Sequence, residues 1–159
     1  WNALCEEASN FGLGFVCRQE EAHHFTVPAH TWGIPLLRLA REMGFGVEVF
    51  YRKHPSDEDE TATSIREKFG EEICVKAFDS FPGMMELFDQ SDAAGIFSYH
   101  FFDWRVTSSG KAIFSAQEFS IGPKGAIESL SQLLRLCKMP FYREYHKYMA
   151  RTQEGLRIG

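Results

Sequence analysis

The sequence predicts a doubly wound α/β domain, with a mainly parallel five-stranded sheet and helices on both faces. This is the three-layer arrangement of Rossmann-like and flavodoxin-like domains. Short apolar runs without helical spacing alternate along the chain with amphipathic helical stretches. Strands that alternate with helices form right-handed crossovers and a parallel sheet covered on both faces. A length of 159 residues, 44% of them hydrophobic, is enough for one domain with a sizeable core.

Five apolar segments are predicted to be strands. Each is brief and lacks helical periodicity, which is typical of strands buried on both faces. In chain order they are residues 12–17, 47–51, 73–78, 93–99 and 112–115.

Helices are predicted between these strands. Residues 1–9 read as the end of a helix that Asn10 terminates, and residues 28–43 carry apolar side chains at helical steps, with Gly44 suited to the C-cap. Ser80 and Pro82 introduce a helix over residues 83–90. Two shorter helices are expected at residues 62–70 and 103–110.

The longest helix follows the fifth strand, and Pro140 ends it. Its apolar stripe consists of Ala126, Leu130, Leu133, Leu134 and Cys137. We therefore divide the chain into the end of a preceding helix (1–10), an α/β domain (11–139) and a carboxy-terminal helix and tail (140–159).

The tail helix is aromatic and basic. Phe141, Tyr142, Tyr145 and Tyr148 would form an amphipathic surface. Such a surface either docks on a neighbouring domain or subunit, or packs back on its own sheet.

Composition excludes several classes of function. A net charge of −5 argues against nucleic acid as the main partner. Neither an uninterrupted apolar run of membrane-spanning length nor a signal-peptide pattern is present, so we expect a cytoplasmic protein with no membrane partner. The chain begins with Trp rather than Met, which suggests a piece of a longer protein.

The cysteines are spread widely. Cys5, Cys17, Cys74 and Cys137 show no C-x-x-C spacing. We expect mostly reduced, mostly buried thiols, and any ligand to a cluster would stand alone among them.

Ligands of doubly wound sheets sit beyond the carboxyl ends of the strands. The loops there are rich in His, Arg and Lys, which suits an anionic ligand. The residues in these loops are Cys17, Arg18, Gln19, Glu20, His23 and His24, then Arg52, Lys53 and His54, then Asp79 and Ser80, then Tyr99, His100, Phe101 and Arg105, and finally Gln117, Glu118 and the Gly122–Gly125 turn.

Common catalytic motifs find little support. The segment "EEAHH" holds two overlapping E-x-x-H spacings, but a di-iron carboxylate site needs a second copy on another helix. Neither the full G-x-G-x-x-G of a nicotinamide site nor a G-x-S-x-G nucleophile elbow occurs. "GPKG" at the start of the last helix could offer backbone amides to an anion.

The order of these pieces resembles the carboxy-terminal domain of nitrogenase component 1 proteins. That family includes the molybdenum–iron protein subunits, their cofactor-assembly scaffolds and the dark-operative protochlorophyllide reductase subunits. The resemblance spans residues 10 to 139 and rests on hydrophobic spacing and glycine placement. The matching stretches are "GLGFVCRQ", "GIPLLRLAREMGFGVEV", "MMELFDQSDAAGIFSY" and "KAIFSAQEFSIGPKGAIESLSQLLRLCKM".

The resemblance implies a pocket wall in a larger oxidoreductase, which accepts electrons from an ATP-dependent iron–sulfur reductase. The pocket would hold an iron–sulfur cluster, a related metallocofactor or a tetrapyrrole, and the isolated chain would be catalytically silent. His100 is expected to shuttle protons. The other expected contacts to the cofactor are Cys17, Arg18, Gln19, His23, Tyr99, Gln117, Gly122, Lys124 and Gly125.

One departure from the family stands out. In the molybdenum–iron protein the turn matching Gly122–Gly125 follows a His that ligates the metallocofactor, but "FSAQEFSIGPKG" contains no His, and Ala116 or Gln117 takes that place. This loss favours a cofactor-assembly scaffold as one rival reading. A non-redox binding module, either a small-molecule or a receiver-like domain, is the other.

Overall fold

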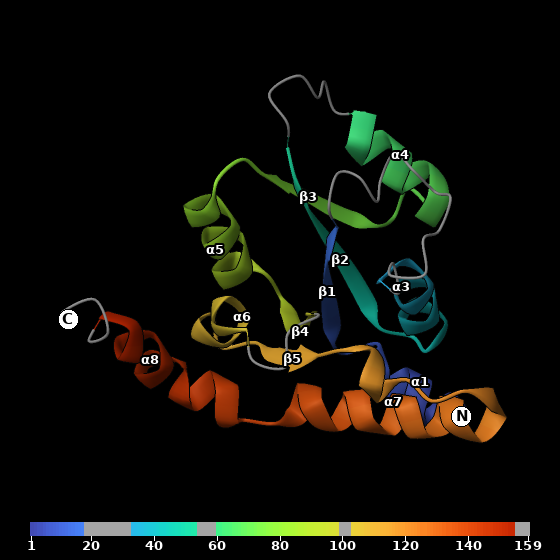
Figure 1. Cartoon of the computed structure of the whole chain (residues 1–159). Helices are drawn as coiled ribbons and strands as arrows, with labels where there is room; N and C mark the ends of the chain where they lie inside the picture. The colour runs from blue at the N-terminus through green and yellow to red at the C-terminus, as the bar shows by residue number, and fades with distance from the viewer. Residues whose placement is uncertain (18–32, 54–59, 99–102, 155–159) are drawn as a thin grey trace.

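Five parallel strands form one sheet in the order β3-β2-β1-β4-β5 (Figure 1). The computed structural model describes residues 1–17, 33–53, 60–98 and 103–154. The strands are β1 Gly12–Cys17, β2 Gly46–Arg52, β3 Cys74–Phe78, β4 Ala93–Phe97 and β5 Ala112–Phe114.

The strand order decides between the expected fold types. The chain moves outward from β1 through β2 to β3, then crosses to the other side of β1 for β4 and β5. This 3-2-1-4-5 order is that of Rossmann folds, whereas flavodoxin-like and receiver domains use 2-1-3-4-5. The doubly wound α/β prediction is confirmed. The receiver-like alternative is wrong, because β3 lies at the edge of the sheet rather than in its centre.

Helices cover both faces of the sheet (Figure 1). One face packs against α1 (Asn2–Ala8), α3 (Gly33–Glu42), α4 (Glu60–Phe69) and α7 (Gly122–Lys138). The other face packs against α5 (Phe81–Gln90) and α6 (Trp104–Ser108). A 3₁₀ turn, η1 (Ala116–Glu118), precedes α7, and α8 (Phe141–Glu154) follows it.

The predicted helical stripes lie in the core. Leu37 and Ala40 of α3 are fully buried, as are Met43 in the turn that follows it and Leu130 and Leu133 of α7. Burying one such aliphatic side chain contributes about 1.5–3 kcal/mol. The stripe of the longest helix is therefore confirmed as its contact with the sheet from Leu130 to Cys137, whereas Ala126 is only half-buried.

Two strands end earlier than was predicted from their apolar residues. The strand expected at 112–115 stops at Phe114, because the Ser115 side chain accepts a hydrogen bond from the Gln117 amide and begins η1. The strand expected at 93–99 stops at Phe97. At the start of α5, Ser80 is the N-cap and Pro82 lies in the first turn, as predicted.

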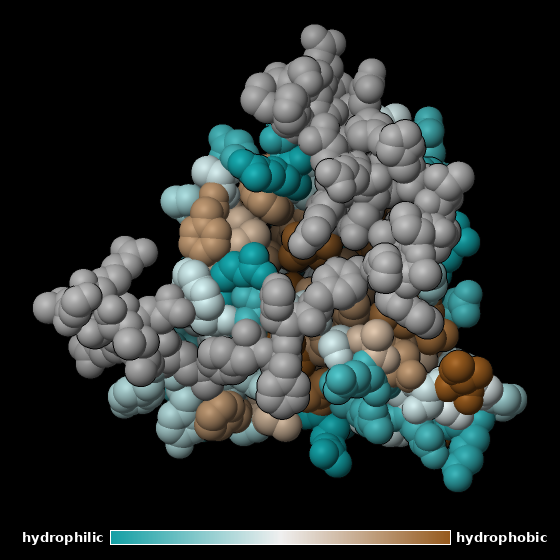
Figure 2. All heavy atoms as spheres, viewed as in Figure 1, coloured by the Kyte–Doolittle hydropathy of each residue, from teal (hydrophilic) through white to brown (hydrophobic). Residues whose placement is uncertain are grey.

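Side chains on one face of the molecule separate by polarity. Figure 2 shows apolar side chains near the middle of this face and polar ones along much of its rim. Within the described part of the chain, no helix combines the length and apolar character needed to cross a membrane.

Gly44 joins α3 to the sheet at a place where a side chain does not fit. Its amide donates to the Arg41 carbonyl at 2.9 Å, and its φ is +95°, a left-handed conformation that favours glycine. A Cβ there would lie 2.6 Å from the Cys5 carbonyl oxygen of α1. The close approach of α1 to the end of α3 therefore depends on glycine.

We predict that Gly44→Ala lowers the free energy of unfolding by about 2–4 kcal/mol, since backbone strain and a backbone clash add together. Gly122→Ala is the matched control: Gly122 has a φ of +86°, but nothing lies within 4 Å of its Cβ position. Strain alone should lower stability there by about 1 kcal/mol. Urea denaturation measures both values, and equal losses would contradict the clash.

Candidate functional site

The sheet reverses its strand order between β1 and β4. Doubly wound sheets generally bind their ligands beyond the carboxyl ends of the strands at such a switch point. On one side of this switch point β1 ends at Cys17. On the other side β4 ends at Phe97, and Ser98 and Asp103 are the described residues that follow.

A compact polar group lies at the β4 side. Ser98 and Asp103 are both only 5% exposed. The Ser98 hydroxyl donates to Asp103 Oδ2 at 2.9 Å. Asp103 is also the N-cap of α6 and accepts a hydrogen bond from the Arg105 amide at 3.1 Å.

The Arg105 guanidinium is held along one edge. Its Nε donates to Asp103 Oδ1 at 2.7 Å, and its Nη2 donates to Oδ2 at 2.5 Å. This bidentate pair fixes the plane of the guanidinium. The Nη1 amino group makes no hydrogen bond to the described residues, and the Arg105 side chain is 37% exposed. Arg105 therefore keeps donors for an anion.

Electrostatics keep this pair ionised. Burial raises the pKa of Asp103, but hydrogen bonds from Arg105 and Ser98 and the charge of Arg105 outweigh it, so the pKa lies below the ordinary 3.8. The hydrogen bond to Asp103 raises the pKa of Arg105. We refer to Ser98, Asp103 and Arg105 as the arginine anchor. Of its three members, the sequence pointed only to Arg105; Ser98 and Asp103 look like ordinary strand-end and N-cap residues.

The end of β5 adjoins the arginine anchor, since the Ser98 amide donates to the Phe114 carbonyl at 2.9 Å. The next residues form a capping box: the Ser115 amide and hydroxyl both donate to Glu118 Oε2. These bonds occupy one oxygen, Oε2, of the Glu118 carboxylate. Beside it Ala116 is half-buried and Gln117 is exposed; one or the other takes the place of the ligating His of the resembling family.

The Gly122–Gly125 segment is the first turn of α7 rather than a separate loop. Gly125 is buried, and a Cβ there would lie 2.6 Å from the Ser120 carbonyl carbon. The Ser129 hydroxyl accepts from the Ser120 amide and donates to the Gly125 carbonyl. Gly125 therefore has a structural reason to be glycine, while Gly122 and Lys124 are exposed.

Several expected contacts fall outside the described residues. These are Arg18, Gln19, His23, Tyr99 and His100, together with the side chain of Cys17. Their participation in a site stays a prediction.

The expectation of mostly buried thiols is wrong for Cys74. Of the described cysteines, Cys137 is buried, Cys5 is half-buried and Cys74 is exposed. Cys74 is the first residue of β3, the edge strand, and is paired there with Glu48 of β2. Burial raises the pKa of Cys137 to about 12, so this thiol stays protonated and inert at neutral pH.

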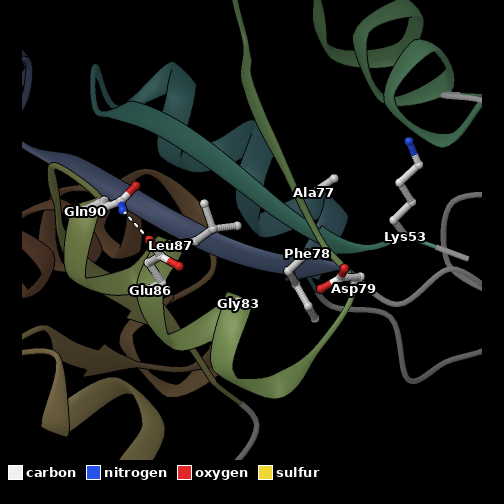
Figure 3. Close-up of a pocket in the computed structure, with 8 residues that line it drawn as sticks. All are labelled: Lys53, Ala77, Phe78, Asp79, Gly83, Glu86, Leu87 and Gln90. Atoms are coloured by element: carbon white, nitrogen blue, oxygen red, sulfur yellow. Dashed lines mark hydrogen bonds between the residues drawn. The ribbon is translucent and has the colours of Figure 1, made fainter.

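A hollow of about 370 Å³ lies beside the edge strand, away from the switch point. It is formed by Lys53, the end of β3 with Asp79, and the outer face of α5 with Glu86, Leu87 and Gln90. Figure 3 shows Glu86 and Gln90 pointing toward each other, joined by a 3.0 Å hydrogen bond, with the Lys53 side chain extending away from them. This hollow lies beside β3, at the opposite edge of the sheet from β4 and β5.

Direct metal ligation finds no support among the described residues. They contain no group of three or more His, Cys, Asp or Glu side chains arranged to hold a metal ion.

Comparison with known proteins adds no assignment. No protein-family model matches the sequence, and no curated protein matches it at a significant level.

We predict that Asp103→Asn makes the free energy of unfolding depend less on pH in the acid range. The lowered pKa means that the carboxylate stabilises the fold above about pH 4, and that this contribution is lost as pH falls through the lowered pKa. At neutral pH the variant should lose about 1–3 kcal/mol of unfolding free energy, because Arg105 loses its charged partner. Urea denaturation from pH 7 down to about pH 2 measures both effects.

The control for that experiment is Asp89→Asn, which removes an exposed carboxylate from α5. It should follow the acid limb of the wild type. Equal slopes for the wild type and Asp103→Asn would show that Asp103 is not the group responsible.

The thiols should differ sharply in reactivity. In the native chain at about pH 8, Cys74 should react rapidly with an aromatic disulfide reagent, and Cys137 only after denaturation, since the thiolate is the nucleophile. Cys74→Ser should remove a rapid phase of thiol modification in the native chain, and Cys137→Ser should leave that phase unchanged. Rapid modification of Cys137 in the folded chain would contradict its burial.

Proposed function

We propose that this chain is a domain of a nitrogenase-like component 1 oxidoreductase, whose carboxyl edge forms one wall of a ligand pocket. The full protein would receive electrons from an ATP-dependent iron–sulfur reductase. The nitrogenase-like part rests on the sequence resemblance over residues 10–139. The observation that carries the pocket wall is the arginine anchor at the switch point of the sheet.

The role of the described residues is recognition of charge. A guanidinium that Asp103 holds by Nε and Nη2 presents Nη1 to a carboxylate or phosphate group. Because the Asp103 carboxylate is desolvated and fully engaged, it orients Arg105 and does not compete for the ligand as a free acid. Ser98 holds Asp103 in this orientation.

The described residues do not fit a role as direct ligands of a metallocofactor. Ala116 or Gln117 stands in place of the family's ligating His, and Glu118 Oε2 accepts the hydrogen bonds of its own capping box. We therefore assign this wall to an anionic portion of the ligand, such as the carboxylates of a tetrapyrrole or of an organic acid. Any metal ligand would come from residues elsewhere.

Two alternatives share this wall. A metallocofactor-assembly scaffold would hold its cargo without turnover, and the loss of the family's His ligand favours such release. A non-redox small-molecule module would need only the arginine anchor. Ligand content separates these readings from the oxidoreductase.

We predict that the protein, purified without oxygen together with its neighbouring subunit, retains several irons with acid-labile sulfide, or a tetrapyrrole chromophore. Arg105→Gln should lower the retained chromophore at least about tenfold, since removing a charged hydrogen-bonding partner weakens binding by about 1.5–3 kcal/mol. Iron and sulfide assays with visible absorption spectra measure the content.

Arg135→Gln is the control, because Arg135 is exposed on α7 and the substitution makes the same change of charge. It should retain the full ligand content. An iron-free, colourless preparation would contradict the oxidoreductase and scaffold readings and leave the small-molecule module. Full retention by Arg105→Gln would remove the arginine anchor from the pocket.

A further inference from the structure

Helix α8 packs on α6 rather than back on the sheet, and it leaves one aromatic face exposed. Tyr142 and His146 are half-buried on the packed side. Gly110, in the turn that ends α6, lies against Arg143 and His146 of α8. Figure 1 shows α8 at the edge of the molecule, running away from the sheet.

The opposite side of α8 carries three aromatic rings in a row. Phe141, Tyr145 and Tyr148 are separated by four and three residues, so they share one helical face. Their rings contact along the helix, with centroids 5.3 Å apart for Phe141 and Tyr145 and 6.3 Å apart for Tyr145 and Tyr148. They are 48%, 47% and 66% exposed. We call these three residues the aromatic stripe.

Large aromatic side chains are enriched in protein interfaces, where they provide contact area with little loss of side-chain freedom. Packing of three neighbouring rings within one helix face, away from the domain core, therefore indicates a surface for another chain. The identity of that chain follows from the charges beside the stripe.

The stripe and its flank are self-complementary. If a second copy of α8 ran antiparallel, with the two-fold axis at Tyr145, Phe141 would lie within one residue, about 1.5 Å along the helix axis, of the level of Tyr148 of the second copy. The same axis brings Glu144 within one residue of the level of Lys147 of the second copy. Both charged residues are exposed and lie on the same flank of the aromatic stripe by helical spacing. A two-fold axis therefore pairs rings with rings and opposite charges with each other, twice.

We propose that the aromatic stripe is the contact through which two copies of this chain pair, with their α8 helices antiparallel. One helix from each copy makes a small interface, so self-association is weak, with a dissociation constant on the order of 100 μM. This inference does not depend on the proposed function, because it involves neither the switch point nor a bound ligand.

Sedimentation velocity of the 159-residue chain over a range of concentrations tests this pairing. The wild type should shift from monomer to dimer as concentration rises. Tyr145→Ser should weaken dimerisation about tenfold or more, because each dimer loses two central rings. Phe81→Ser is the matched control: Phe81 is also 47% exposed but lies on α5, and its loss should leave the dimer unchanged.

A charge exchange tests the antiparallel register. Glu144→Lys should weaken the dimer roughly threefold to tenfold, since it sets like charges opposite each other twice. Adding Lys147→Glu should restore it. Glu67→Lys makes the same charge change on α4 and serves as the control.

Each outcome of these experiments either supports or overturns the proposed pairing. A chain that stays monomeric at all concentrations, as expected if the stripe serves another domain or a different subunit, overturns the proposal. So does a dimer that tolerates Tyr145→Ser. Failure of the double charge exchange to restore association overturns the antiparallel arrangement, and circular dichroism checks that each variant keeps its helix content.

Discussion

Three phenylalanine rings tie together the strand ends on which the candidate site depends. Phe15 of β1 stacks with Phe97 of β4 at 5.7 Å and meets Phe114 of β5 edge-on at 5.4 Å. Phe97 and Phe114 contact each other at 5.7 Å, and all three rings are almost fully buried. Because Ser98 and Ser115 follow Phe97 and Phe114 directly, this cluster fixes the backbone from which the arginine anchor and η1 start. Aromatic contacts of this kind add to the burial of the rings themselves.

On the opposite face of β1 the packing requires a residue without a side chain. Gly14 has no side chain, and a Cβ there would lie 2.7 Å from the Phe50 ring and 3.2 Å from Ile96. The ring and the aliphatic chain fill that space and contact α5 and α6 through Phe88 and Val106. A large side chain on one face and none on the other let the central strand support two different cores.

Polar groups at the two ends of the sheet differ in whether their hydrogen bonds are satisfied within the chain. At the amino end, Glu48 accepts hydrogen bonds from Lys76 and Ser91, and the Lys111 ammonium donates to the Ser91 carbonyl. These groups satisfy one another and close that end of the sheet. At the carboxyl end the arginine anchor satisfies Asp103 but leaves donors of Arg105 to a ligand, which fits the general position of binding sites in parallel sheets. Under the proposed function, the groups that stabilise the sheet and the group that would recognise the ligand lie at opposite ends of the strands.

The sequence alone determined the strands, the helices and the parallel α/β class, because apolar periodicity follows from burial on one or two faces. It also indicated that polar residues would gather beyond the strand ends. Strand order was decided only by the tertiary structure, since local patterns cannot distinguish β3 at an edge from β3 at the centre. The same holds for Asp103, whose importance comes from bonds to Ser98 and Arg105 in a buried setting, and for α8, whose docking on α6 left the aromatic stripe outside. These features depend on packing between elements that are distant in the chain, and they cannot be derived from the chemistry of single residues.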